Sequence, residues 1–323
     1  MTPAITDVAG ITVGHAHDDV ALTGVTVVLC PEGAVASVDV RGGGPATRET
    51  DLLAPEAMVQ QVHAVALCGG SAMGLDAAAG VVQWLREHNY GFDTRITRVP
   101  IVPGAALFDL GIGQADRFPD PVMGYAACQA AGTAVAEGNL GAGIGATIGK
   151  ILGPASAMKA GVGTWSERLP DGTTVGALVV VNAFGDVRDL DGTRLAGARN
   201  PLTGEPGDTM ALLRDPRMLP AFGGVSPEAL TNTTLAVVAT DATLDKAAAR
   251  KLAQMAQVGL ARTINPIHTP FDGDAVFALA TGRRPAPPMI IMGSIAAEVL
   301  ARAVTRAVLA ATSLGGLPGA GSA

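Results

Sequence analysis

The chain of 323 residues has few charged and few aromatic side chains. Only 16% of its residues are Asp, Glu, Lys or Arg and only 3% are aromatic, whereas about 25% of residues are charged in an average soluble protein. A net charge of −7 provides no basic stripe for a phosphate backbone, and so few rings provide no stacking platform for single strands. Composition therefore argues against nucleic acid as a partner.

The chain also lacks long apolar runs, although 48% of its residues are hydrophobic. No uninterrupted apolar stretch of about 18 residues is present to span a bilayer. The N-terminal segment MTPAITDVAGITVG has neither the basic region nor the apolar region of a signal peptide. We therefore expect a cytoplasmic protein with no membrane partner. Because so little charge cannot easily cover so apolar a chain, we also expect a homo-oligomer.

Cysteine is scarce as well. Cys30, Cys68 and Cys128 lie far apart, and each is surrounded by apolar residues. We interpret them as buried free thiols, because no flanking residue would activate a thiolate. The conventional nucleophile and phosphate motifs are missing too: the sequence contains no G-x-S-x-G, no H-E-x-x-H and no P-loop.

Two weak candidates for a cofactor or metal site remain. The segment GGSAMG (69–74) follows an expected strand and opens an expected helix, but it lacks the G-x-G-x-x-G spacing, so tight packing explains its glycines. His15 and His17 could share one strand face, yet two ligands without a third make a poor zinc site. We therefore predict no cofactor and no metal.

Short apolar runs separated by glycine predict alternating strands and alanine-rich helices. Strands are expected at 24–30, 34–40, 63–68, 176–187, 234–242 and 274–282, with Pro31-Glu32-Gly33 as a turn between the first two. Helices are expected from Ser71 to 88, at Met123–Glu137, from a Thr243 cap to Gly259, and from Ser294 to 312. Residues 188–230 are expected to be irregular and the tail from 313 disordered. Without a clean βαβ repeat, this order favours a layered α+β or α/β sandwich in one domain.

The unusual feature of the sequence is TNTTLAVVATD, residues 231–241. A polar turn entering a buried strand would explain it. A threonine hydroxyl at a strained junction offers a second interpretation: Thr233 Oγ attacks the Asn232 carbonyl, and water hydrolyses the resulting ester. The freed α-amine has a reference pKa of only about 7.7–8.0. It could therefore take the proton of its own hydroxyl, and no histidine would be needed.

From this junction outward the sequence resembles the L-aminopeptidase/D-esterase and β-aminopeptidase family of self-processing N-terminal nucleophile hydrolases. The endo-type 6-aminohexanoate-oligomer (nylon-oligomer) hydrolases belong to the same family. The resemblance covers nearly the whole chain through seven motifs in order: ITDVAGITVGHAHD, GVTVVLCPEGAVASVDVRGGGPATRETDLL, LCGGSAMGLDAAAGV, GAGIGATIGK, KAGVGT, VVVNAFGD and HTPFDGDAVFALATG. It implies an αββα-like sandwich in one hydrolase domain, residues 1–323. It also implies autocleavage into an α-chain (1–232) and a β-chain (233–323), with four αβ units assembled as a homotetramer.

The resemblance also implies roles for particular residues. Thr233 becomes the nucleophile, and the amide of Asn182 helps to form the oxyanion hole. Lys150 lies beside the nucleophile, where its charge would favour the neutral amine of Thr233. Asp272 and Asp274 orient that amine and the hydroxyl, and Lys150 compensates their charge.

The residues alone leave plainer alternatives for the same positions. Asn182 could be a turn residue that ends a strand, and Lys150 an ordinary solvated lysine. Asp272 and Asp274 would point to one face of an extended segment, where two acids repel each other unless a cation or strong donors lie nearby. An exposed turn or a calcium or magnesium site would also suit them, although no further oxygen ligands cluster there.

Two departures bear on the substrate. Phe108 lies where several relatives have a tyrosine near the substrate, so a hydroxyl contact is missing at this substrate-binding position. A threonine nucleophile and the Asp-Gly-Asp pair resemble the nylon-oligomer branch more than the D-esterase branch. The expected function is hydrolysis of small linear amides, such as 6-aminohexanoate oligomers or short peptides. Alternatives are a β-peptidyl or L-aminopeptidase without nylon-oligomer activity, an acyltransferase similar to ornithine acetyltransferases, and a scaffold that never cleaves.

Overall fold

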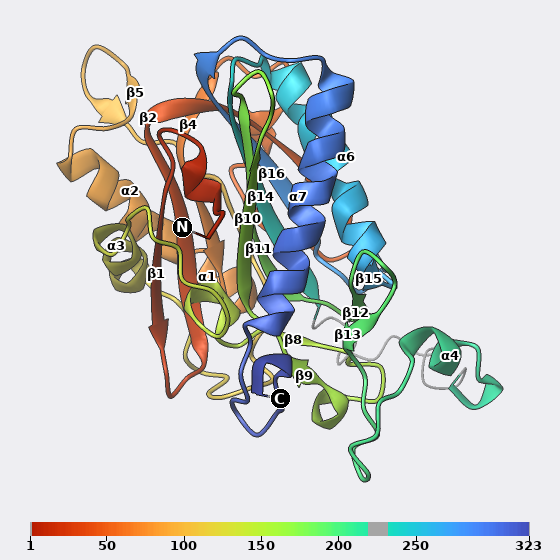
Figure 1. The fold of residues 1–323 in the computed structure, drawn as a ribbon. Helices are drawn as coiled ribbons and strands as arrows, with labels where there is room; N and C mark the ends of the chain where they lie inside the picture. The colour runs from red at the N-terminus through yellow and green to blue at the C-terminus, as the bar shows by residue number, and fades with distance from the viewer. Residues whose placement is uncertain (1, 219–231, 323) are drawn as a thin grey trace.

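A computed structural model describes residues 2–218 and 232–322 of the chain. Its main sheet contains β1 (Thr12–Asp18), β2 (Thr23–Val40), β3 (Ala46–Arg48), β4 (Gln61–Cys68), β7 (Gly104–Ala106), β10 (Val162–Arg168), β11 (Thr174–Asn182), β14 (Thr233–Ala242) and β16 (Ala275–Arg284). Minor strands are β5 (Phe92–Asp93), β6 (Arg98–Val99), β8 (Thr147–Ile148), β9 (Met158–Lys159), β12 (Asp186–Arg188), β13 (Arg194–Ala196) and β15 (Ile264–Asn265). The α-helices are α1 (Ser71–Gly74), α2 (Ala77–Glu87), α3 (Pro121–Gln129), α4 (Thr209–Leu213), α6 (Lys246–Thr263) and α7 (Met289–Leu309) (Figure 1).

The main sheet is continuous, with the order β10-β11-β14-β16-β2-β4-β7-β3 and β1 paired to β2. Successive side chains of a strand point to opposite faces, and every residue of β14 is buried. Its Ala236 and Val238 pack in a core with α6 and α7, whereas Leu235 and Val237 pack in a second core with β2 and β4. β14 therefore lies inside the molecule, with apolar layers on both faces.

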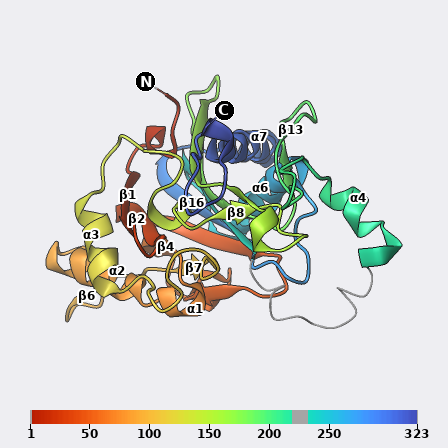
Figure 2. The same cartoon turned by 90° about the horizontal axis from the view of Figure 1, so that it is seen from below.

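A third core lies on the other side of β2 and β4, where α2 and α3 cover them. The two halves of the sheet thus face each other across the second core, and helices cover both outer faces. Figure 2 shows α6 and α7 on one side and α1 and α2 on the other. This layering confirms the predicted αββα-like sandwich.

The predicted turn at Pro31-Glu32-Gly33 is wrong, because β2 continues through it as one long strand. The pairing with β4 shifts between Leu29 and Ala34, and Gly33 has φ +95°. Such a β-bulge absorbs extra residues without ending the strand. β2 pairs with β1 before the bulge and with β16 after it, so it contributes to both halves of the sheet.

Contacts that a linear pattern cannot show explain most of the wrong helix boundaries. The chain leaves α3 after Gln129 because Gly132 pairs with Val13 of β1. α6 is capped by Asp245, which accepts from the Ala248 amide at 2.7 Å. The expected Thr243 cap is wrong, and α6 continues past Gly259. At that glycine a Cβ would lie 2.3 Å from a backbone oxygen of α7, so the residue serves close packing of two helices and not a helix end.

Other boundaries differ in the same way. α7 begins at Met289, and the Ser294 hydroxyl donates back to the Ile290 carbonyl at 2.6 Å, so it does not cap the helix. Two helices, α1 and α2, replace the single helix expected from Ser71. The segment after β11 is irregular as predicted, with short elements up to residue 218, and 219–230 lie outside the described residues. The predicted disorder of the tail is wrong over 313–322, where Pro318 accepts from the Lys159 amide at 2.8 Å.

The prediction for the cysteines is confirmed. Cys30, Cys68 and Cys128 are buried and free. Burial raises the pKa of each thiol to about 12, so none of them supplies a thiolate near neutral pH. Within residues 2–218 and 232–322, the structure contains no helix long and apolar enough to cross a membrane.

Candidate active site

The main sheet places Thr233 at the first position of β14, next to two other elements. In the antiparallel ladder with β11, Thr233 lies directly opposite Asn182. On its other side, pairing with β16 begins only at Leu235 and Ala275. One isolated bridge precedes this ladder, between Asn232 and Asp272. The end of a buried strand therefore brings Thr233 between Asn182 and the Asp-Gly-Asp segment.

The backbone at Gly273 contacts the bond that is predicted to be cleaved. The carbonyl oxygen of the Asn232–Thr233 peptide accepts a hydrogen bond from the Gly273 amide at 3.0 Å. The Thr233 hydroxyl donates to the same oxygen. A Cβ on Gly273 would lie 2.7 Å from Thr233 Oγ1. Glycine thus leaves room for the hydroxyl and aims an N–H at the oxygen on which charge would develop during an attack.

Asp274 connects this segment to β14. Its carboxylate is fully buried, and Oδ1 accepts from the Thr234 amide at 2.7 Å. Oδ2 accepts from the backbone amide of His268 at 3.1 Å and faces His268 Nδ1 at 2.9 Å. With these partners Asp274 satisfies the rule that buried charged groups are hydrogen-bonded.

Asp272 is also buried, but its environment differs. Its Oδ2 accepts from the Thr269 amide at 2.8 Å and from the Thr269 hydroxyl at 2.5 Å. Burial, followed by repulsion from Asp274, raises the pKa of Asp272 to about 6, and the Lys150 ammonium opposes this rise. Asp272 can therefore gain or lose a proton near neutral pH.

The side-chain amide of Asn182 is held from both ends. Its Oδ1 accepts from Lys150 Nζ at 2.7 Å and from the Thr147 amide at 3.0 Å. Its Nδ2 donates to the Phe108 carbonyl at 3.0 Å. Lys150 Nζ also donates to the Asn182 main-chain oxygen at 3.3 Å. The plane of the amide opposite Thr233 is thereby fixed, and Phe108 reaches the site through its backbone.

Lys150 can accept a proton at this site when its side chain is neutral. Burial lowers its pKa to about 7, and the charge of Lys159 lowers it further, whereas Asp272 and Asp109 oppose the shift. About half of such a side chain is neutral at pH 7. The alternative of an ordinary solvated lysine is therefore wrong.

Lys159 is a second buried lysine that the sequence did not single out. It is fully buried, and its Nζ donates to the carbonyls of Ile144 at 2.6 Å and Ala146 at 2.8 Å. Burial lowers its pKa to about 7. Ala146 immediately precedes Thr147, whose amide donates to Asn182, and Ile144 lies two residues before Ala146. Lys159 thus fixes the segment that orients the Asn182 side chain.

Asp109 fixes the segment that contacts the Nδ2 end of the Asn182 side chain. It is buried and accepts from the Thr23 hydroxyl at 2.8 Å and the Gly70 amide at 2.7 Å. Burial raises its pKa, while these donors and the charge of Lys159 lower it. Asp109 follows Phe108, the acceptor for Asn182 Nδ2. The glycine turn at 69–70 therefore donates a backbone hydrogen bond to a buried carboxylate, consistent with the predicted structural role.

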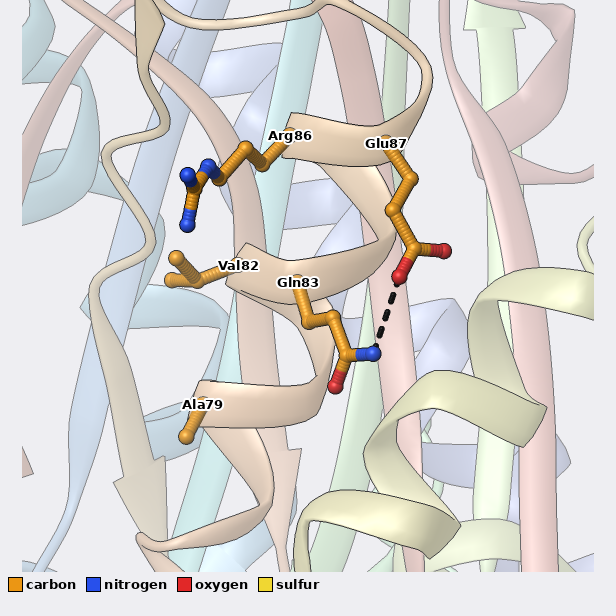
Figure 3. Close-up of a pocket in the computed structure, with 5 residues that line it drawn as sticks. All are labelled: Ala79, Val82, Gln83, Arg86 and Glu87. Atoms are coloured by element: carbon orange, nitrogen blue, oxygen red, sulfur yellow. Dashed lines mark hydrogen bonds between the residues drawn. The ribbon is translucent and has the colours of Figure 1, made fainter.

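A depression on the outer face of α2 is lined by Ala79, Val82, Gln83, Arg86 and Glu87 (Figure 3). These residues come from one helix, and Gln83 donates to Glu87 at 2.9 Å, so the surface is an ordinary exposed helix face. In the part of the chain that the structure describes, no three His, Cys, Asp or Glu side chains are grouped to hold a metal ion.

The structure therefore brings together the five predicted side chains Thr233, Lys150, Asn182, Asp272 and Asp274. Comparison with known proteins now decides the family. A family model described as Peptidase family S58 matches residues 3–321. The chain belongs to peptidase family S58.

Relatives in this family are similar over almost the whole chain. An uncharacterized aminopeptidase of Mycobacterium leprae is 48% identical, over 98% of this chain and 92% of its own length. A 6-aminohexanoate-oligomer endohydrolase of an Agromyces species is 29% identical, over 93% of this chain and 84% of its own. Membership of S58 makes this chain an enzyme of a peptidase and amide hydrolase family.

A solved structure shows the same fold. The L-aminopeptidase D-Ala-esterase/amidase of Ochrobactrum anthropi, described as a variant of the Ntn hydrolase fold, matches with a TM-score of 0.73 at 22% identity. The match covers 98% of this chain and 89% of the other. The S58 chain thus has the Ntn hydrolase type of layered architecture, as its own sheet and helices indicate.

Proposed function

We propose that this S58 enzyme is a self-processing threonine amide hydrolase. Thr233 cleaves the Asn232–Thr233 bond, and the freed threonine then hydrolyses small linear amides. The observation that carries the proposal is the geometry at the junction, where the Thr233 hydroxyl and the Gly273 amide both contact the Asn232 carbonyl oxygen. A nucleophile and an oxyanion donor at one buried peptide bond are what such a cleavage requires.

Processing takes place in two steps. Thr233 Oγ attacks the Asn232 carbonyl carbon, the C–N bond breaks, and the leaving nitrogen takes a proton, so the acyl group moves from nitrogen to oxygen. Water then hydrolyses this ester and leaves the Asn232 carboxylate and a free Thr233 with amine and hydroxyl. The Gly273 N–H stabilises the charged oxygen, a contribution of about 2.7–4 kcal/mol in comparable sites.

The proton of the Thr233 hydroxyl needs a different acceptor before and after processing. In the precursor the Thr233 nitrogen is an amide and cannot accept it, so we assign this role to the neutral form of Lys150. In the mature enzyme the Thr233 amine, with a reference pKa of about 7.7–8.0, becomes the base. Lys150, Asp272 and Asp274 then set the charge around this amine.

We assign the oxyanion donor for the substrate to Asn182. Its amide lies opposite Thr233 and is held by Lys150, Thr147 and Phe108. Nδ2 donates to the Phe108 carbonyl, which holds this amide group beside the nucleophile, and we assign the oxyanion role to the same group. Processing and turnover thus use different donors, Gly273 first and Asn182 afterwards.

The substrate class is proposed from the relatives. The 6-aminohexanoate-oligomer endohydrolases act, by their name, on oligomers of a linear ω-amino acid. We propose small linear amides of this kind or short peptides, with Phe108 as an apolar contact to the chain of the substrate. Assembly of four αβ units and a cytoplasmic location stay predictions.

Intact-mass measurement of the purified protein tests the proposal. We expect fragments 1–232 and 233–323, and hydrolysis of at least one member of a panel of 6-aminohexanoate oligomers, β-peptides and L-aminoacyl amides. An amine acceptor added to the same assay separates hydrolysis from acyl transfer. A full-length chain that persists, or acyl transfer that greatly exceeds hydrolysis, would contradict the proposed function.

Replacing Asn182 with alanine should lower kcat by about 10²–10³-fold, the usual loss of one oxyanion donor, while self-cleavage continues through Gly273. Steady-state kinetics and a denaturing gel of the same preparation measure both effects. Asn182→Asp is the matched control, because it keeps the oxygen that Lys150 and Thr147 contact and loses the N–H donor. An Asn182→Asp enzyme with wild-type kcat would show that the donor is another group.

A further inference from the structure

His268 places a half-buried imidazole beside Asp274 at the site. It lies in the loop between β15 and β16, and its side chain is 18% exposed. Nδ1 lies 2.9 Å from Asp274 Oδ2, and the His268 main-chain amide donates to the same oxygen at 3.1 Å. One residue therefore makes two contacts with a single carboxylate oxygen.

The proton of the imidazole can be assigned from these contacts. An ionised carboxylate only accepts hydrogen bonds, so Nδ1 carries the proton. Nε2 is buried and has no hydrogen-bond partner among the residues that the structure describes. The tautomer with its proton on Nδ1 places no N–H on this buried nitrogen. His268 thus donates to Asp274 through Nδ1.

The backbone at His268 is held in an unusual conformation. Its φ is +57°, in the left-handed region that residues other than glycine seldom adopt. This conformation turns the amide and the ring of His268 toward the same Asp274 oxygen. Strained backbone of this kind persists where the surrounding structure imposes it, and it gathers at functional sites.

Asp274 transmits this constraint to the nucleophile. Its other oxygen accepts from the Thr234 amide at 2.7 Å, one residue before the β14–β16 ladder begins at Leu235. The carboxylate therefore takes the place of a ladder partner at that position. Fixing the Thr234 N–H fixes the plane of the peptide that joins Thr233 to Thr234, and with it the direction of the Thr233 side chain.

We propose that His268 is a positioning residue for the nucleophile: it holds Asp274, and Asp274 holds the Thr233–Thr234 peptide. The inference rests on the proposed function of Thr233. It also assigns different roles to Asp274 and Asp272. Three hydrogen bonds hold Asp274 in place, whereas burial and the repulsion from Asp274 raise the pKa of Asp272 to about 6, so Asp272 is the carboxyl that exchanges a proton.

Two substitutions at position 268 test the proposal while keeping the backbone conformation. Asparagine and glycine both tolerate positive φ. The amide nitrogen of asparagine can occupy the place of Nδ1, whereas glycine offers no side-chain donor. We expect His268→Asn to process and turn over at close to the wild-type rate. His268→Gly should slow both by about 10–100-fold, because a shift of about 1 Å in a reacting group can cost 10²-fold.

A double-mutant cycle shows whether His268 acts through Asp274. In an Asp274→Asn background, His268→Gly should cause little further loss, because residues in one hydrogen-bond chain are not additive. Processing half-life on a denaturing gel and kcat are the readouts. If His268→Gly unfolds, His268→Asp replaces it: aspartate tolerates positive φ and offers a repelling oxygen, so it should lose at least as much activity.

The outcomes separate the two levels of the proposal. Equal rates for His268→Gly and wild type, equal losses for His268→Asn and His268→Gly, or full additivity with Asp274→Asn would each overturn the role of His268. A wild-type chain that neither cleaves itself nor hydrolyses amides would overturn the proposed function of Thr233 before any variant is compared.

Discussion

Replacing Thr233 with alanine should leave the chain at its full length and abolish amide hydrolysis. The substitution removes the hydroxyl that contacts the Asn232 carbonyl, and within residues 2–218 and 232–322 the only hydroxyl that contacts this carbonyl is that of Thr233. In a serine protease, loss of the nucleophile costs about 10⁶-fold in kcat, and we expect a loss of that order. Intact mass and a substrate assay on the same preparation measure the two effects.

Thr233→Ser is the matched control, because it keeps Oγ and removes only a methyl group. It should still produce the fragments 1–232 and 233–323 and retain hydrolysis. Both variants should fold, since Thr233 lies at the end of a strand whose ladder with β11 uses backbone groups. Cleavage and hydrolysis by Thr233→Ala would show that another residue is the nucleophile.

The position of the nucleophile was predictable because local pattern and fold agree there. The apolar run from Leu235 to Val238 is buried on both sides, and it reads as a core strand in the sequence alone. The polar residues before it mark where the strand begins. What places Thr233 opposite Asn182 is the pairing of two strands far apart in sequence, and the VVVNAFGD motif carried that information only through the family resemblance.

The glycine and histidine around the junction were not predicted, and the reason is geometric. Gly273 stood between two acids and gave no sign that its amide reaches Asn232. His268 lies in the HTPFDGD motif, but its contact with Asp274 depends on a positive φ that no residue pattern specifies for histidine. Such contacts become visible only when loop backbone is placed next to the strand.

Buried charges were missed for a different reason. Lys159 and Asp109 have the residue types of a protein surface, and lysine and aspartate are seldom fully buried unless paired. In the structure they form hydrogen bonds that fix the two segments in contact with Asn182. The glycine-rich, apolar sequence around Lys150 was a usable signal that its charge would be buried, and the same signal lies around Lys159 in AMKAGVG.

Self-cleavage should slow as the pH falls through about 7, the pKa to which burial lowers Lys150. The reason is that only neutral Lys150 accepts the Thr233 proton in the precursor. Well below that pH, the rate should fall about tenfold for each pH unit. Chain made by cell-free translation and transferred to buffers from about pH 5 to about pH 9 shows the rate on a denaturing gel.

Lys150→Met should remove this inflection and slow cleavage by about 10²–10⁴-fold, the usual contribution of a general base. Asp272, whose pKa is raised to about 6, is the competing base. If Asp272 took the proton, the inflection would lie near 6 and would survive Lys150→Met.

Asp272→Asn gives the decisive control. The Asp272 charge raises the pKa of Lys150, so removing it should move the Lys150 inflection to lower pH while cleavage continues, and loss of cleavage with no such shift would assign the proton to Asp272.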